Sequence, residues 1–279
     1  MPYEAEIRRG APTAFLFLVD QSGSMSDLMA TTGKSKASAV VDVINKTIFG
    51  LIQRSTKADG VRDHFDLGII GYGGDGVGNV FLGQLGDKVL NPVSLFEANP
   101  LRIEERVKRS DDGAGGILEQ IVKFPVWFDP KASGGTPMCQ AIRQAALELA
   151  EWCDTHPDSY PPTVLHVTDG ESTDGDPEAL AAQLCQISTS DGQVLMMNLH
   201  LSSNLGNPIA YPSSDSGLPD SYAKMLFRMS SVLPEKVVRM AQEKSFPASF
   251  ESRGFMFNVT DSVNVVDFID IGTRAAQMR

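Results

Sequence analysis

A carboxylate and two hydroxyls alternate near the start of the chain, at Asp20, Ser22 and Ser24. Side chains at alternate positions of one tight turn can converge on a single point, and Gly23 allows the chain to bend there. Carboxylate and hydroxyl oxygens are hard donors that suit Mg²⁺ or Mn²⁺, with Ca²⁺ as an alternative, whereas zinc sites use His and Cys. Because no His or Cys lies near this turn in the sequence, the pattern predicts a site for a hard divalent cation.

Two further oxygen donors occur far along the chain. Thr136 lies between a Gly-Gly pair and a proline, at the predicted start of a helix, where we expect it to act as the N-cap. Asp169 follows a predicted strand and precedes a glycine. Ligands bind at the carboxyl ends of strands in open parallel sheets, so both residues can meet Asp20 at one sheet edge. Two carboxylates there would repel each other without a cation, which favours a metal site over an ordinary polar turn.

Apolar patterning places these donors on a chain of alternating strands and helices. Near-continuous apolar runs, typical of strands buried on both faces of a parallel sheet, occupy residues 13–20, 163–168, 194–201 and 255–260. Amphipathic helices are predicted at 34–53, from 137, from 177, at 222–232, at 234–244 and from 262 to about 275. This alternation predicts an α/β fold with a Rossmann-like open, mostly parallel sheet, helices on both faces and one antiparallel edge strand.

A glycine-rich segment interrupts the alternation. We predict antiparallel strands at 65–72 and 80–82, joined by a turn at 73–78. A G-x-G-x-x-G pattern begins at Gly71, but a dinucleotide site needs this pattern to open a helix, so a hairpin turn is favoured. We expect this turn, together with the loop at 202–218, to shape the rim of the metal site.

The remaining segments indicate one domain with two irregular regions. Helical pieces are predicted at 97–109 and 117–123, separated by a break at 110–116. Residues 202–218 are rich in Ser, Asn, Gly and Pro, which predicts a long exposed loop. We therefore expect a single domain over 10–279, with a short extension at 1–9 and variable inserts at 83–133 and 202–250.

The composition restricts the classes of partner. The chain has 279 residues and a net charge of -11, which disfavours nucleic-acid phosphates and anionic membranes. Basic residues between 102 and 109 are interleaved with Glu, so they indicate a solvated helix face. Residues 1–10 are charged and no long apolar run follows, which predicts neither a signal peptide nor a membrane span. Three cysteines without a C-x-x-C pair favour a cytoplasmic location.

Taken together, Asp20-x-Ser22-x-Ser24, Thr136 in GGTP and Asp169 in TDGE resemble the metal-ion-dependent adhesion site (MIDAS) of von Willebrand factor type A (vWA) domains. The resemblance covers nearly the whole chain in the order of its predicted strands and helices. It implies a divalent ion held by the three hydroxyls, with the two carboxylates acting directly or through water, and one open coordination position. In this family an acidic side chain of a partner protein often fills that position, so the resemblance implies a binding module and not an enzyme.

The resemblance also implies a biological setting. Free-standing bacterial vWA proteins of this kind are similar to those associated with tellurite-resistance and stress clusters, whose neighbours include a kinase-like protein and a phosphatase. This implies a cytoplasmic signalling or stress-response scaffold. The alternative is an adaptor subunit of an AAA+ ATPase or chelatase-type complex, because such subunits carry the same metal site.

An enzymatic alternative uses Asp20 as a phosphoryl-accepting nucleophile, as in haloacid-dehalogenase-like phosphatases. Such enzymes require D-x-D, whereas Ser22 occupies the position of the general acid here. His166 and His200 lie in predicted strands and are expected in the core or at the rim, not beside a nucleophile. Three acidic residues near the site are expected to be solvated: Asp27, Glu171 and Asp174.

Overall fold

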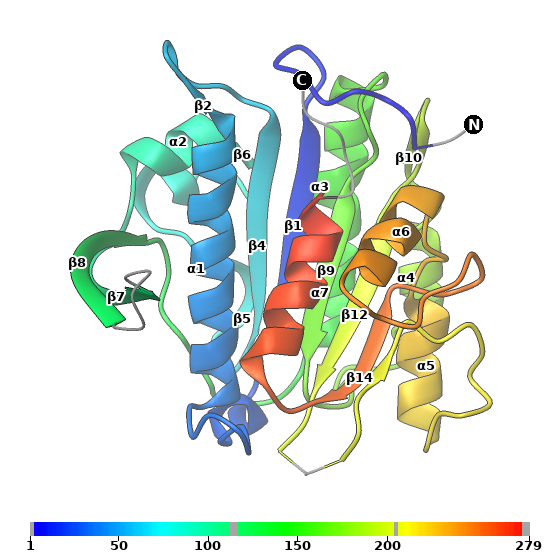
Figure 1. Ribbon diagram of the computed structural model, residues 1–279. Coiled ribbons are helices and arrows are strands. Elements are labelled where there is room, and N and C mark those ends of the chain that lie inside the picture. The colour runs from blue at the N-terminus through cyan, green and yellow to red at the C-terminus, as the bar shows by residue number, and fades with distance from the viewer. Residues whose placement is uncertain (1–2, 112–116, 204–205, 275–279) are drawn as a thin grey trace.

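The computed structural model describes residues 3–111, 117–203 and 206–274, and Figure 1 shows one central sheet with helices on both faces. Within these residues the sheet has eight strands: β1 (Thr13–Gln21), β4 (Phe65–Gly73), β5 (Gly76–Asn79), β6 (Asn91–Pro92), β9 (Thr163–Thr168), β12 (Leu195–Leu201), β13 (Ile209–Ala210) and β14 (Phe255–Val259). Their order is β13-β14-β12-β9-β1-β4-β5, and β6 pairs with β4.

The central strands run parallel, from β14 through β12, β9 and β1 to β4. Antiparallel strands flank them at both edges, with β5 and β6 on β4 and β13 on β14. The mostly parallel, Rossmann-like sheet expected from the sequence is confirmed, but the expectation of a single antiparallel edge strand is wrong. Ile209–Ala210 in β13 lies within the polar segment 202–218, and two residues are too few to show an alternating pattern.

Helices bury both faces of the sheet because successive strand residues point in opposite directions. On one face lie α1 (Lys36–Ser55), α2 (Val93–Ala98), α6 (Glu235–Glu243) and α7 (Ser262–Arg274). On the other lie α3 (Met138–Thr155), α4 (Glu178–Leu184) and α5 (Ser221–Met229). Phe15 and Phe17 of β1 pack into the first layer, whereas Leu16 and Leu18 pack into the second. This double burial explains the uninterrupted apolar runs in the sequence.

The prediction of helices at 97–109 and 117–123 is wrong. The segment forms a projecting hairpin of β7 (Arg102–Asp111) and β8 (Ile117–Val126), visible beside α1 in Figure 1. Residues four apart, such as Ile103 and Val107, share a face in a helix and also in a strand, so their spacing does not separate the two structures. Both side chains are exposed, so the hairpin has no buried face whose apolar pattern would distinguish a strand from a helix. Most of the predicted break, 112–116, lies outside the described residues.

The antiparallel pairing predicted for the glycine-rich segment is confirmed, since Gly73 and Gly76 are paired in the register of β4 and β5. The predicted position of the second strand is wrong, because β5 occupies residues 76–79 inside the predicted turn and residues 80–82 form no strand. The shortest elements are β2 (Thr56–Lys57), β3 (Gly60–Val61), β10 (Ser188–Thr189), β11 (Gly192–Gln193) and the 3-10 helices η1 (Gly23–Ser26) and η2 (Gly83–Gly86). Among the helices of the described residues, none has the length and apolar character needed to cross a bilayer.

Candidate metal centre

The ends of two neighbouring strands bring the two carboxylates to the same sheet edge, the lower edge in Figure 1. β1 and β9 are parallel neighbours, with Val19 opposite Val167. Asp20 follows Val19 in β1, and Asp169 is the first residue after β9. Asp20 is fully buried, and the side chain of Asp169 is 0% exposed. The strand-end placement expected from the sequence therefore holds for both carboxylates.

Hydrogen bonds connect the carboxylates through the serine hydroxyls. Asp20 accepts bonds from the backbone N of Ser22 at 2.8 Å and from Thr168 Oγ1 at 2.8 Å. The hydroxyls of Ser22 and Ser24 lie 3.2 Å apart, and Ser24 Oγ donates to Asp169 Oδ1 at 2.7 Å. Four of the five expected residues thus form a continuous polar chain.

Thr136 completes this group from a third loop. A methyl group added to Gly170 would lie 3.7 Å from Thr136 Oγ1 and 3.8 Å from Ser24 Oγ. Both hydroxyls therefore face the same small space next to Asp169. Two carboxylates and three hydroxyls form an all-oxygen donor set that fits a hard divalent cation. Within the described residues, no group of three or more His, Cys, Asp or Glu side chains could hold a metal ion.

Backbone contacts hold the loops of the site against each other. The backbone N of Ser133 donates to Gln21 O at 2.8 Å, and that of Gly23 donates to Gly134 O at 3.0 Å. Gly134 has a φ of +68°, and a Cβ on it would lie 2.3 Å from Gly74 Cα, so only glycine fits there. Gly74, in the turn after β4, thus supports the Thr136 loop. The 202–218 segment instead carries β13 at the far edge of the sheet, beyond β14 and β12.

The structure corrects the expected role of Thr136 as a helix cap. Helix α3 begins at Met138 with Pro137 at its N-cap position, and no side chain of that residue caps it. The carboxylate of Asp174 caps the helix instead, accepting bonds from the backbone N of Cys139 at 2.9 Å and of Gln140 at 3.0 Å. Asp174 is therefore a capping residue and not the solvated neighbour expected from the sequence. Its contribution was invisible locally because it lies 35 positions from Cys139.

The electrostatics of the site favour a bound cation. Burial raises the pKa of the Asp20 carboxyl above its usual value, against the lowering effect of hydrogen bonds from Ser22 and Thr168. The charge of Asp169 raises this pKa further. The pKa of the neighbouring Tyr72 hydroxyl also lies well above its usual value, first through burial and then through the charge of Asp20. A divalent cation would stabilise the ionised carboxylates and oppose these effects.

Sequence reasoning missed Lys36, which contacts the site directly. Its Nζ lies 2.8 Å from Asp169 Oδ2 and 3.6 Å from Asp27 Oδ2. Lys36 is the first residue of α1, after the N-cap Ser35. A positive charge is unfavourable at a helix N-terminus, so a lysine at that position is the sequence signal that could have indicated a nearby carboxylate. Asp27, with its side chain 58% exposed, is solvated as expected.

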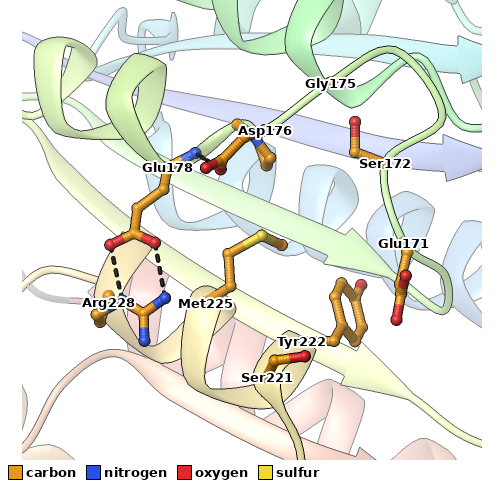
Figure 2. Close-up of a pocket in the computed structure, with 10 residues that line it drawn as sticks. Glu171, Ser172, Gly175, Asp176, Glu178, Ser221, Tyr222, Met225 and Arg228 are labelled. Atoms are coloured by element: carbon orange, nitrogen blue, oxygen red, sulfur yellow. Dashed lines mark hydrogen bonds and ion pairs between the residues drawn. The ribbon is translucent and has the colours of Figure 1, made fainter.

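A pocket of about 390 Å³ lies beside the candidate centre, between the loop after β9 and helix α5 (Figure 2). Glu171 and Tyr222 line the side nearest Asp169, and the Tyr222 hydroxyl donates to the carbonyl oxygen of Gly170. On the opposite side, Arg228 makes two hydrogen bonds of 2.7 Å to Glu178, drawn as dashed lines in Figure 2. Glu171, expected to be only solvated, therefore forms part of a concave surface next to the site.

Both strand histidines lie in packed surroundings, as expected. His166 is fully buried, and burial lowers its pKa to about 4. His200 stacks on Phe257 with ring centroids 4.5 Å apart, and burial lowers its pKa to about 4 as well.

Comparisons with known proteins add information on the fold. No family model and no curated protein matches the chain. Among solved structures, the chain is similar to the pilus adhesin SpaC from Lactobacillus rhamnosus GG, with a TM-score of 0.50 and 13% identity over 97% of this chain and 31% of the adhesin. It is also similar to proximal thread matrix protein 1 from the mussel byssus, with a TM-score of 0.44 and 13% identity over 82% of this chain and 43% of that protein. The chain thus spans less than half of each, and the similarity to the adhesin concerns the fold alone.

Proposed function

We propose that this chain is a metal-dependent protein-recognition module of the vWA type. Ser22, Ser24 and Thr136 would hold Mg²⁺ or Mn²⁺, with Asp20 and Asp169 acting directly or through water. The main support is the convergence of three hydroxyls and two buried carboxylates from three separate loops. Lys36 compensates only one of the two carboxylates, through Asp169 Oδ2, so the pair keeps an uncompensated negative charge that a bound cation would neutralise.

The burial of the donors indicates how a partner would approach. Ser22 and Thr136 are buried, whereas Ser24 is exposed. A cation held among these hydroxyls would therefore be accessible from the Ser24 side. Neutral hydroxyl donors leave a divalent ion short of negative charge, so it attracts a further oxygen ligand. We infer that a Glu or Asp of a partner protein supplies this ligand, and that the module binds without catalysing a reaction.

The cellular role we infer is that of a cytoplasmic scaffold in signalling or stress response. The three cysteines are unpaired, which is compatible with a reducing compartment. An adaptor role in an AAA+ ATPase complex would use the same site, and the identity of the captured partner separates the two roles. Phosphoryl transfer from Asp20 is disfavoured because its carboxylate is buried and bonded to Ser22 and Thr168, with no second carboxylate two residues later.

Metal binding is tested by titrating Mg²⁺ and Mn²⁺ into the purified protein by calorimetry. We expect binding in the range of about 0.1 to 1 mM for the isolated chain, since the open position lacks its partner carboxylate. Asp20→Ala and Thr136→Ala should abolish or strongly weaken it. Asp66→Asn is the matched control, because Asp66 is a largely buried carboxylate at the opposite end of the neighbouring strand β4. Equal binding by the wild type and the Asp20→Ala variant would contradict the site.

Partner recognition is tested by capture from extracts of the native host in Mg²⁺ and in EDTA. A metal-bridged partner is retained only in Mg²⁺, by the wild type and by the Asp66→Asn control. It is lost with Asp20→Ala and with Thr136→Ala. Partners retained by all variants and in EDTA would show that recognition uses another face of the protein.

A further inference from the structure

A buried ammonium group occupies the edge of the candidate metal centre. The side chain of Lys36 is only 5% exposed, and its Nζ lies 2.8 Å from Asp169 Oδ2. Lysine is almost never buried unless it is paired, because the charged group loses its hydration. The partner is equally buried, since the side chain of Asp169 is 0% exposed. The contact is therefore a desolvated ion pair and not a surface salt bridge, which solvent would weaken.

The structure around Lys36 holds this ion pair in place. The backbone N of Lys36 donates to Asp27 O at 2.9 Å, and Ser35 caps the helix that Lys36 begins. The position is electrostatically unfavourable for a cation in a helix, so the carboxylate of Asp169 must compensate for it. Lys34, two residues earlier, is exposed in contrast. Burial at Lys36 is thus specific to that residue and not a property of the whole loop.

Asp169 uses both of its carboxylate oxygens within the protein. Oδ1 accepts from Ser24 Oγ at 2.7 Å, and Oδ2 accepts from Lys36 Nζ at 2.8 Å. The ammonium therefore contacts the same carboxylate that contacts a hydroxyl donor of the metal site. Any cation in the space between Ser24 and Thr136 would be repelled by Lys36 and would compete with it for Asp169.

We propose that Lys36 is an internal counter-cation that weakens metal binding and couples it to an acidic partner. Without metal, Lys36 compensates one of the two carboxylates. Asp20, Asp169 and Lys36 then carry one net negative charge instead of two, which lowers the cost of burying them. A divalent cation turns this into one net positive charge, which a single partner carboxylate neutralises. The chain then binds the ion weakly alone and more tightly in the complex. The metal-free part of this inference stands by itself, whereas its effect on metal affinity rests on the proposed function.

The first test titrates Mn²⁺ alone into the wild type, Lys36→Met and Lys34→Met. Removing a positive charge a few ångströms from the site should tighten Mn²⁺ binding by about tenfold or more in Lys36→Met. Lys34→Met is the matched control and should stay within about twofold of the wild type. Lys36→Gln provides a second neutral variant that keeps a hydrogen-bond donor, in case Lys36→Met folds poorly. Binding by both neutral variants that is equal to or weaker than that of the wild type would overturn the inference.

The second test measures thermal unfolding in EDTA, where no metal contributes. Lys36→Met should unfold roughly 5 °C or more below the wild type, because Asp169 keeps a buried charge without its partner. Saturating Mn²⁺ should remove most of this difference, since it supplies the missing positive charge. An unchanged unfolding temperature in EDTA would show that Asp169 does not depend on Lys36.

The two proposals fail in different ways. If the wild type, Lys36→Met and Asp20→Asn bind no Mn²⁺, or bind it equally, the metal site itself is wrong and the effect of Lys36 on it is wrong too. If the wild type binds Mn²⁺ and Asp20→Asn does not, the metal site stands. The Lys36 variants then decide the inference by their affinity alone.

Discussion

Two polar clusters lie on neighbouring strands of the same sheet and differ in their charge. One is the candidate metal centre at the ends of β1 and β9. The other is a buried network in which the Tyr72 hydroxyl lies 2.6 Å from His166 Nε2, and His166 Nδ1 lies 2.7 Å from Asn198 Oδ1. The network continues from Asn198 Nδ2 to Ser230 Oγ at 2.9 Å and from there to the carbonyl oxygen of Leu226 at 2.8 Å.

Every polar atom of the histidine network has a partner, whereas the candidate metal centre keeps uncompensated charge. Since Asn198 Oδ1 is an acceptor, His166 donates from Nδ1 and accepts the Tyr72 hydroxyl at Nε2, so a neutral imidazole satisfies every bond. The candidate metal centre instead contains two carboxylates and one ammonium at an edge where Ser24 is exposed. A neutral, fully bonded cluster stabilises the fold, while a cluster with excess charge and an opening to solvent is suited to a ligand.

Replacing Asp20 by a neutral residue should give the largest effect in a test of this difference between the two clusters. We expect Asp20→Asn to lose the stabilisation by Mg²⁺ completely, because the variant removes an anionic donor. Its stability in EDTA should rise or stay equal, since burial disfavours the charged Asp20 and raises its pKa. Thermal unfolding with Mg²⁺ and with EDTA measures both effects. A variant that retains the full Mg²⁺ response would show that the edge cluster is structural, like the histidine network.

Acid should lower the stability of the folded chain through the histidine network. Measuring this effect in EDTA excludes any contribution from a bound metal. Burial lowers the pKa of His166 from 6.5 to about 4, so between these values the unfolded chain binds a proton that the folded chain does not. Stability should therefore fall as the pH drops from 6.5 to 4, by about 3 kcal/mol from this residue alone. Urea unfolding in EDTA over this range measures the slope. His166→Gln should unfold with a shallower pH dependence, and an identical slope would contradict the assignment.

Thr136→Val separates metal binding from stability at one residue. The variant keeps the shape of the side chain and removes the hydroxyl, so Mn²⁺ affinity should fall by about 10- to 100-fold. Unfolding in EDTA should change by less than about 0.5 kcal/mol, because the hydroxyl does not cap α3. A large loss of stability would restore the role of helix cap that the sequence suggested.

Asp174→Ala should give the smallest effect of the four variants. In contrast to Thr136→Val, it should lower the stability of the fold. Loss of the cap on α3 should cost about 1 kcal/mol of stability in EDTA, as for other capping residues. Glu171→Ala is the control, since Glu171 is an exposed acidic neighbour in the same loop. Equal stability of the two variants would show that the bonds from Cys139 and Gln140 contribute nothing measurable.

Sequence-based prediction succeeded where burial leaves a clear pattern. The strand at 13–20 is a continuous apolar run because both faces of β1 are covered, and its end locates Asp20. The same reasoning located Asp169 after β9. It failed at the hairpin of β7 and β8, which projects from the sheet with Ile103, Val107 and Ile121 exposed. Without a buried face, residues spaced by four fit a helix and a strand equally well.

The sequence by itself located Asp20 and Asp169 at the ends of two strands, because the apolar runs that precede them are local patterns. Only the tertiary structure decided which side chains form ion pairs and hydrogen bonds with each other. Lys36 and Asp169 are 133 positions apart and meet because α1 packs on the sheet. The cap of α3 is likewise a contact between distant residues: Asp174 caps the helix, so the Thr136 hydroxyl is available to the candidate site. Such pairings arise from the docking of distant elements, so no local pattern of residues records them.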